Sequence, residues 1–138
     1  MGRSLIKLLA LSLTFGAACS DITESDPSRA GRYVLARING EMLPILFIET
    51  PIARLYFLRG ELRLNKDQTF TDITDMRLEP KSSGSSITFP SDTTKGSYRL
   101  AGDTVVLTTT QAQQYRMVFQ ASGSLQQELV GNMLTYRK

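Results

Sequence analysis

The chain has 138 residues, 41% of them hydrophobic and 21% charged, so its length suits one globular domain and its composition excludes wholesale disorder. It contains no His, no Trp and one Cys. Catalysis by a His general base, Cys/His zinc clusters and intrachain disulfides are therefore excluded. Basic residues outnumber acidic ones by 16 to 13. Two of them, Arg3 and Lys7, lie in a segment that we expect to be removed, so the near balance of charge argues against a nucleic-acid partner.

Residues 1–18 have the pattern of an export signal. Arg3 and Lys7 supply its positive end, an apolar run covers residues 8–15, and small residues follow at 16–18. The apolar run is too short for a transmembrane helix, which needs about 20 residues. The pattern therefore predicts a signal peptide that is cleaved from the mature protein.

The cysteine, Cys19, directly follows the small residues Gly-Ala-Ala at 16–18. This sequence resembles the lipobox of bacterial lipoproteins, whose cysteine is diacylated and becomes the mature N-terminus. The resemblance implies lipid attachment at Cys19, and Ser20 after it implies the outer membrane of the cell envelope, with the domain facing the periplasm. The alternative is an ordinary secretory peptide cleaved near Ala18, which would leave a secreted or soluble periplasmic protein.

Residues 19–30 are polar and charged, are interrupted by Pro27, and include Ile22 as their large apolar residue. Such a composition is typical of a flexible linker. We therefore expect a lipidated tether over residues 19–30 and a single folded domain over residues 31–138.

The domain alternates short β-prone runs with turn residues, and no window of a dozen residues keeps a helical i, i+3, i+4, i+7 stripe. Turn signals such as Asn39-Gly40 and Ala101-Gly102-Asp103 recur every 8–12 residues, as in an antiparallel meander. The sequence predicts strands over residues 32–39, 43–49, 53–64, 69–78, 86–89, 96–100, 104–110, 114–120 and 132–137.

Alternation within the runs assigns the faces of the sheet. In the run 53–64 it predicts that Leu58, Leu62 and Leu64 point inward and that Arg59, Glu61 and Arg63 point outward. A sheet of about eight strands with one apolar face has two exposed edge strands. Closing into a barrel is the simplest way to remove these edges. The expected fold is all-β, a small antiparallel up-and-down β-barrel, with a two-sheet sandwich as the alternative. The charged outward residues argue against a transmembrane barrel.

The segments 33–44, 60–70, 96–107 and 134–138 resemble those of small bacterial lipoproteins with a lipocalin-like barrel. The resemblance implies that fold over residues 31–138 and concerns strand and turn architecture rather than chemistry. It implies that Gly31-Arg32-Tyr33 lies at the closed end of the barrel, where lipocalins carry Gly-x-Trp. It further implies that Arg137, on the last strand, stacks on that aromatic ring.

Barrels of eight strands are either filled by side chains or hold one small ligand. We expect a non-catalytic binding module for a small apolar ligand, without a cofactor. The alternative for these side chains is a packed core. The expected ligand-binding residues are the inward apolar and aromatic side chains Tyr56, Leu58, Tyr98, Tyr115, Met117 and Phe119, and Tyr136 belongs to the same group of side chains.

A second function from another class remains open at this point. The long connection 79–95 is a candidate lid over one mouth of the barrel, or a surface through which a protein-interaction or inhibitor module acts on another envelope protein. Arginines that alternate with apolar residues are candidates for an anionic partner such as a lipid head group or glycan, although acidic residues are interspersed among them: Arg59, Arg63, Arg77, Arg99 and Arg116.

Neither a metal site nor an enzyme is expected. Asp67, Asp72, Asp75 and Glu79 lack the alternate spacing and the glycine of a calcium loop, and strand alternation separates Asp72 from Asp75, so we expect solvated, structural carboxylates. The Ser-rich stretch 81–86 begins with a lysine, but a flexible loop explains it better than a Ser–Lys dyad. No nucleophile–base pair emerges from the sequence.

Overall fold

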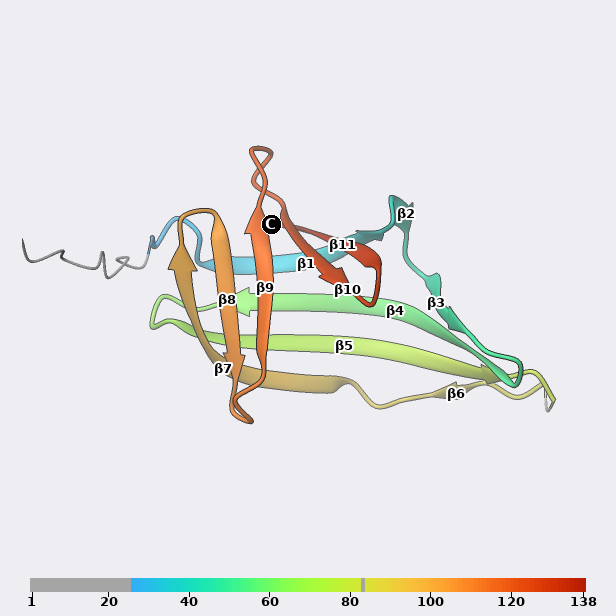
Figure 1. Ribbon diagram of the computed structural model, residues 1–138. Coiled ribbons are helices and arrows are strands. Elements are labelled where there is room, and N and C mark those ends of the chain that lie inside the picture. The colour runs from blue at the N-terminus through green and yellow to red at the C-terminus, as the bar shows by residue number, and fades with distance from the viewer. Residues whose placement is uncertain (1–25, 83) are drawn as a thin grey trace, which may run out of the picture.

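Eleven strands form one antiparallel sheet in the computed structural model, which describes residues 26–82 and 84–138 (Figure 1). They are β1 (Gly31–Ile38), β2 (Glu41–Met42), β3 (Ile45–Glu49), β4 (Ala53–Leu64), β5 (Thr69–Pro80), β6 (Ile87–Thr88), β7 (Asp92–Ala101), β8 (Thr104–Thr109), β9 (Gln114–Phe119), β10 (Leu125–Leu129) and β11 (Asn132–Arg137). The described residues contain no helix. The all-β prediction is confirmed.

Eight of these strands close into a barrel. Their order is β1, β4, β5, β7, β8, β9, β10 and β11, and β11 pairs with β1 again. Consecutive strands of this set are neighbours in the sheet, which is the up-and-down topology predicted from the turn spacing. The closed sheet excludes the sandwich alternative.

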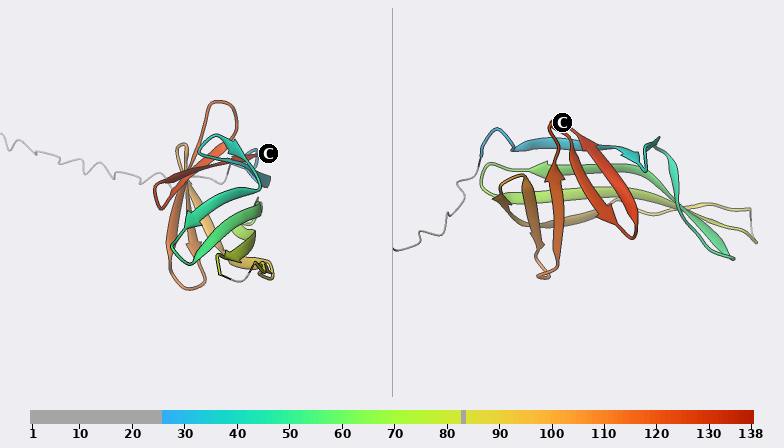
Figure 2. Two further views of the ribbon diagram at one scale, coloured as in Figure 1. Left: turned by 90° about the vertical axis from the view of Figure 1, so that its right-hand side faces the viewer. Right: turned by 45° about the horizontal axis from the view of Figure 1, so that its top comes forward.

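The remaining short strands extend the sheet beyond the barrel. β1 pairs with β4 only over residues 61–64, and β7 pairs with β5 only over residues 69–74. Farther along, β3 flanks β4 and β6 flanks β5 instead. Figures 1 and 2 show this part, formed by β3, residues 53–57 of β4, residues 76–80 of β5 and β6, projecting past the other strands. We call it the wing.

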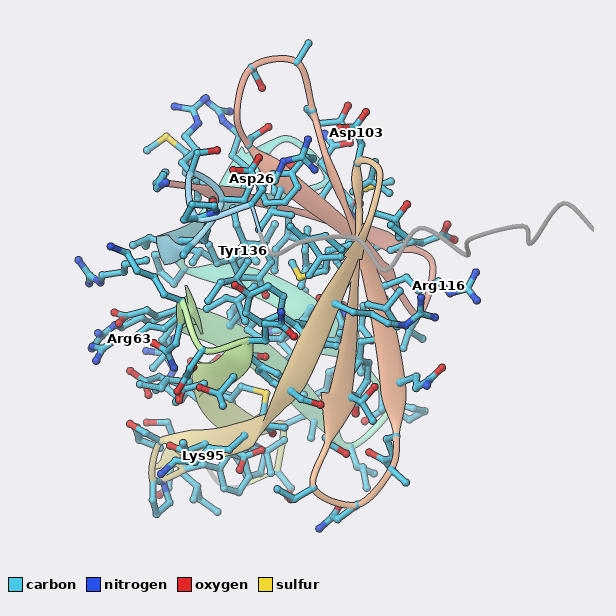
Figure 3. The ribbon with its side chains drawn as sticks, turned by 90° about the vertical axis from the view of Figure 1, so that its left-hand side faces the viewer. Asp26, Arg63, Lys95, Asp103, Arg116 and Tyr136 are labelled. Carbon is cyan, nitrogen blue, oxygen red and sulfur yellow. The ribbon has the colours of Figure 1, made fainter. Side chains whose placement is uncertain are left out.

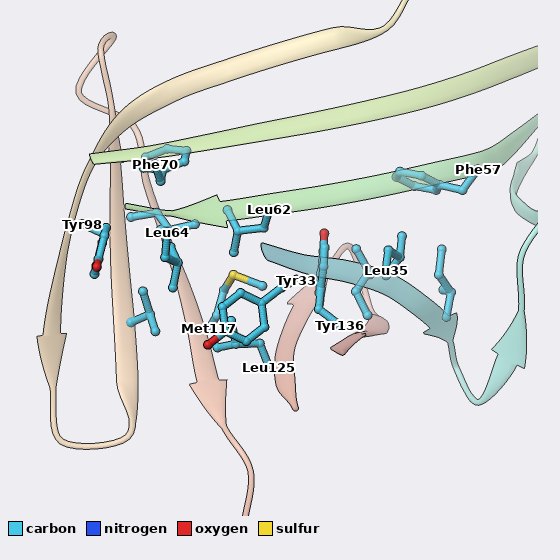
Figure 4. Close-up of a cluster of buried hydrophobic side chains, with 14 of the residues drawn as sticks. Tyr33, Leu35, Phe57, Leu62, Leu64, Phe70, Tyr98, Met117, Leu125 and Tyr136 are labelled. Carbon is cyan, nitrogen blue, oxygen red and sulfur yellow. The ribbon is translucent and has the colours of Figure 1, made fainter. Parts of the chain in front are cut away.

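The core of the barrel is built by alternation along the strands, which register shifts in β1 and β4 interrupt. One inward row per strand supplies buried side chains such as Tyr33, Leu62, Tyr98, Met117 and Tyr136. Figure 4 shows these side chains pointing into the space between the strands, with Phe57 toward β3 and Tyr98 at the opposite end. The end with Tyr98 is the closed end, and the end with Phe57 is the mouth.

A β-bulge in β4 changes the predicted faces. The pairing of β4 with β5 shifts register between Phe57 and Arg59, so Leu58 is the extra residue. Leu62 and Leu64 are buried and Arg59 and Arg63 exposed, as predicted. Before the bulge the parity reverses, so the prediction for Leu58 is wrong and Phe57 takes the inward position.

Two strand predictions also differ from the structure. The run 125–129, Leu-Gln-Gln-Glu-Leu, was not expected to be a strand, but it forms β10 between β9 and β11. β5 continues to Pro80 and β7 begins at Asp92, so much of the expected 79–95 connection belongs to strands.

Candidate functional site

A cavity of about 290 Å³ lies inside the barrel toward the mouth. Its size is at the lower edge of the range of about 300–1,000 Å³ that is typical of small-molecule sites. Most of the residues that line it are apolar or aromatic: Phe47, Phe57, Leu62, Phe70, Met76, Leu107, Tyr115, Met117, Leu129, Leu134 and Tyr136. Such a lining suits an apolar molecule or part of one.

Two phenylalanines form the rim of the cavity where β3 meets β4. The rings of Phe47 and Phe57 pack edge to face, with centroids 4.7 Å apart and planes at 85°. Ile45 on β3 lies directly opposite Phe57 on β4, and this pairing places β3 beside the rim of the cavity. Since Phe47 comes from the wing strand β3, the wing completes one wall of the mouth.

The polar part of the lining comes from β5 and β7. Asp72 lies opposite Thr94, and Thr74 lies opposite Asp92, so the two carboxylates are diagonal neighbours on the inward face. Burial raises the pKa of Asp72 to about 6, and the negative charge of Asp92 adds to this effect. Asp72 Oδ1 is buried and has no hydrogen-bond partner among the described residues.

Tyr136 connects the polar and apolar parts of the lining. It lies on β11, opposite Leu35 and Leu125, and its side chain is buried. Burial raises the pKa of the Tyr136 hydroxyl, and the charge of Asp72 contributes to the rise. The hydroxyl therefore stays neutral at ordinary pH.

The closed end is sealed by aromatic rings and by the segment before β1. The Tyr33 hydroxyl donates a hydrogen bond to the Arg29 carbonyl at 2.7 Å, and the Tyr33 ring packs against Phe119 with centroids 6.0 Å apart. The Arg29 guanidinium lies 4.6 Å from the centroid of Phe119. Arg29 falls within the stretch 19–30, so the contacts of the domain begin before residue 31.

The cation over Tyr33 is Lys138 and not Arg137, which corrects the expectation drawn from the lipocalin resemblance. Lys138 Nζ lies 5.8 Å from the Tyr33 ring centroid and donates a hydrogen bond to the Ser28 carbonyl at 2.7 Å. Tyr136 points inward, so Arg137, the next residue, is exposed on the outer face. Tyr33 itself is at the closed end, as expected.

The structure brings two of the six predicted ligand-binding residues, Tyr115 and Met117, to the cavity. Tyr98 and Phe119 also point inward but pack at the closed end, where the Tyr98 hydroxyl donates to the Asn65 carbonyl at 2.8 Å. Tyr56 lies on the outer face of the wing, with the Arg77 guanidinium 5.1 Å from its ring centroid. Leu58 is displaced by the bulge.

Sequence reasoning missed Phe47, Phe57 and Asp72. The alternation rule places Phe57 correctly only if the bulge is known. Gly60, on the inward parity of the same run, indicates that a bulge or bend is favourable nearby but does not fix it at Leu58. Asp72 shares the inward parity of Phe70, so that rule alone could have indicated an inward carboxylate. The expectation that Asp72 is solvated is wrong, because the barrel closes around its side of the strand. Its separation from Asp75, which does not line the cavity, is confirmed.

The outward arginines Arg59 and Arg63 surround a carboxylate. Together with Arg32 they form ion pairs of 2.5–2.8 Å with Glu61, whose side chain they cover completely. These hydrogen bonds hold the pKa of Glu61 far below its usual range. Three cations around one anion leave a local excess of positive charge on the outer face of β1 and β4. Figure 3 shows Arg63, Lys95 and Arg116 directed outward.

Two other candidate groups, Asp67 and Lys81, have structural partners. Asp67 Oδ1 accepts hydrogen bonds from the backbone N–H and the hydroxyl of Thr69 within a hairpin turn. Lys81 forms an ion pair of 2.8 Å with Glu49. In the part of the chain that the structure describes, no group of three or more potential metal ligands is found. Within the 79–95 connection, Asp92 and Thr94 line the cavity, and none of the described residues among 81–82 and 84–90 does.

The predicted signal peptide (1–18) and the lipid attachment site Cys19 lie outside the described residues. Among residues 26–82 and 84–138 there is no helix of the length and hydropathy needed to cross a membrane.

Comparison with known proteins adds no identification. No protein-family model matches the chain, and neither a curated protein nor a solved structure matches it.

Proposed function

We propose that the protein is a non-catalytic binding module that holds a small apolar ligand in the mouth of its barrel. The observation that carries this proposal is the cavity of about 290 Å³ with its largely apolar and aromatic wall. A barrel whose interior served only stability would be filled by side chains along its whole length. Here the interior holds a cavity whose wall runs from Phe47 and Phe57 at the mouth to Phe70 and Leu107.

The proposed location is the outer membrane, with the domain anchored through lipid on Cys19 and facing the periplasm. Arg29 packs at the closed end, beside the turn at Gly102 and Asp103. A tether that enters there would keep the closed end nearest the membrane and turn the mouth away from it. Cys19 and Asp26 are seven positions apart in the sequence, which allows at most about 25 Å between them in a fully extended chain. A ligand would therefore enter from the periplasm.

Native mass spectrometry of protein purified from membranes tests the binding function. We expect a co-eluting small molecule with the wild type and its loss in Thr94→Phe, which places an aromatic ring in the cavity. The matched control is Val118→Phe, because Val118 is 42% exposed and lies next to the inward Met117. Ligand retained in Thr94→Phe, with both variants folded by circular dichroism, would contradict a cavity site.

The anchor is tested separately by metabolic labelling with a fatty acid. We expect the label on the wild type and none on Cys19→Ser, which should leave the membrane fraction. An unlabelled wild type would favour the secreted or soluble periplasmic alternative and would leave the cavity proposal intact.

A second candidate function, protein interaction through the segment 79–95, is favoured by the wing. Four apolar residues lie opposite one another across its strands: Ile48, Leu55, Leu78 and Ile87. They share the face of Phe57 and Met76, which line the cavity. Ile87 is 51% exposed. An envelope protein with a complementary apolar surface would cover this row.

In-cell cross-linking from a photoreactive residue at position 87 separates the two functions. A single cross-linked protein, lost when Ile48 is changed to Lys, would support the interaction module. A ligand carrier needs no fixed partner, so diffuse cross-linking together with a co-purified ligand would support the first proposal.

A further inference from the structure

The cavity contains a charged group that its own walls do not neutralise. Asp72 Oδ1 is buried without a hydrogen-bond partner in the described structure, on the inward face of β5. A buried polar atom without a partner costs free energy, and a buried charge costs more. The inward neighbours of Asp72 on β5 are Phe70 and Thr74, and neither carries a charge that would pair with a carboxylate.

No cation faces Asp72 from the surrounding strands. The residues that line the described cavity include neither Lys nor Arg. The titratable groups among them are Asp92 on β7, Tyr115 on β9 and Tyr136 on β11, besides Asp72 itself. Across the sheet, Asp72 faces Leu62 on β4 and Thr94 on β7. The cavity thus has a negative polar part and an otherwise apolar, aromatic wall.

We propose that the cavity takes a small amphiphilic amine, whose ammonium group binds Asp72 and whose apolar body fills the aromatic part of the cavity. This inference rests on the proposed ligand-binding function and specifies the class of ligand. An ammonium group donates charge-assisted hydrogen bonds to a carboxylate, which supply the partner that Asp72 Oδ1 lacks. The faces of nearby aromatic rings also attract a cation.

The same charges select against other amphiphiles. A fatty acid would bring a third carboxylate toward Asp72 and Asp92. Asp72 is largely shielded from solvent while Asp92 is exposed, so the repulsion is stronger at Asp72. A neutral alcohol can donate one hydrogen bond but does not neutralise the charge. The expected order of affinity for one chain length is therefore amine, then alcohol, then carboxylate.

The volume limits the size of the ligand. At roughly 30 Å³ for each non-hydrogen atom, the volume that a water molecule occupies in the liquid, about ten atoms fill the cavity. An eight-carbon chain with one polar group has about that size. Longer chains would extend through the mouth past Phe47 and Phe57 and lie along the wing.

Calorimetric titration with n-octylamine, n-octanol and n-octanoate tests the inference. The full chain carries Cys19→Ser, so that no attached acyl chain competes for the cavity. At pH 7.5 we expect octylamine to bind at least tenfold more tightly than octanol, and octanoate to bind most weakly. Because burial places the pKa of Asp72 near 6, the octylamine affinity should fall about tenfold per pH unit below that value.

Asp72→Asn and Asp75→Asn form the matched pair of variants. Both residues lie on β5 and each has a buried Oδ1 without a partner in the described structure, but Asp72 lines the cavity and Asp75 does not. We expect Asp72→Asn to weaken octylamine at least tenfold and to leave octanol within threefold of the parent chain. Asp75→Asn should change neither affinity.

The outcomes separate the inference from the proposed function. If octanol or octanoate binds as tightly as octylamine, or if Asp72→Asn leaves octylamine unaffected, the amine inference is wrong while the binding function stands. If none of the three probes binds to folded protein, the binding function itself fails.

Discussion

Arg29 reaches across the closed end of the barrel to Asp103, 74 residues away in sequence, and Arg29 Nη2 lies 2.8 Å from Asp103 Oδ1. The same guanidinium donates through Nη1 to the Gly102 carbonyl at 2.6 Å and covers the ring of Phe119. One side chain thus joins the segment before β1 to the β7–β8 turn and to the end of β9. Figure 3 views this end of the molecule, with Asp26 and Asp103 at its rim.

Arg29→Ala should loosen the closed end. It removes a charge-assisted hydrogen bond and a cation–π contact, so we expect the free energy of unfolding to fall by about 1–2 kcal/mol. Urea denaturation measures this change, and faster amide exchange at the start of β1 would localise it. Arg99→Ala is the control, because Arg99 is exposed on β7. Equal stability of the two variants would contradict the sealing role of Arg29.

Gly96 is predicted to be the glycine that tolerates alanine least. A Cβ at this position would lie 2.0 Å from the Thr108 carbonyl oxygen and 2.7 Å from Phe70 Cε1. The Thr108 carbonyl belongs to the backbone of β8, so no side-chain rotation can relieve this contact, and β7 would have to separate from β8. We therefore expect Gly96→Ala to lower the free energy of unfolding by about 3 kcal/mol. Thermal denaturation followed by circular dichroism measures the loss.

Gly60→Ala is the comparison for this prediction. Its Cβ would meet the side chain of Leu35, with Leu35 Cβ at 2.8 Å, rather than backbone. Leu35 Cβ moves only with the backbone of β1, but its contact is 2.8 Å compared with 2.0 Å at Gly96, so we expect a smaller loss than for Gly96→Ala. A larger loss of stability for Gly60→Ala than for Gly96→Ala would show that β7 and β8 can separate more easily than the structure indicates.

The barrel follows from local signals that act independently of one another. The Asn39-Gly40 turn, predicted from its sequence, has φ values of 52° and 85°, the positive values that a type I′ hairpin turn requires. The predicted run 53–64 coincides with β4. These features depend on residues close together in the chain, so period-2 alternation and turn chemistry are enough to predict them.

Features that depend on distant residues were not predictable in this way. β10 carries Gln127 at an inward position, and its Gln-Gln-Glu centre has little β-propensity, so its strand conformation depends on pairing with β9 and β11. The bulge at Leu58 is fixed by how β4 pairs with β5. This bulge exchanges the inward and outward faces of β4 for the residues that precede it. The residues at the mouth of the cavity were therefore predicted less well than those in its interior.

Val130→Asn is predicted to stabilise the barrel. Val130 and Gly131 form the β10–β11 turn with φ values of 51° and 74°, the same geometry as Asn39-Gly40. A β-branched residue is strained at positive φ, whereas Asn tolerates it. Since Val130 is 79% exposed, its replacement loses little packing. We expect a gain of about 1 kcal/mol in the free energy of unfolding, measured by urea denaturation.

The reciprocal variant is Asn39→Val. It introduces the same strain and also removes two side-chain contacts, Asn39 Nδ2 to Asn132 Oδ1 at 2.7 Å and the Met133 N–H to Asn39 Oδ1 at 2.8 Å. Its loss should therefore exceed the gain in Val130→Asn. No gain in Val130→Asn would mean that the β10–β11 turn accommodates valine without strain.

Asp72→Asn should stabilise the ligand-free protein at neutral pH. The pKa of Asp72 is raised from 3.8 to about 6 in the folded protein, so between these values the folded state holds a proton that the unfolded state has released. This group therefore favours folding at low pH, and its contribution is lost as the pH rises toward 6 and above. Removing the charge should raise the free energy of unfolding at pH 7.5 by about 1–3 kcal/mol.

The pH dependence distinguishes this effect from a change in packing. The stability difference between Asp72→Asn and the parent chain should be largest above pH 6. It should shrink steadily toward pH 4, because the folded chain already holds a proton on Asp72 there and the unfolded chain begins to bind one. Denaturation curves at pH 4, 5, 6 and 7.5 measure it. A constant difference across this range would mean that Asp72 is ionised without penalty in the folded barrel, and the cavity would then offer no unmet negative charge to a ligand.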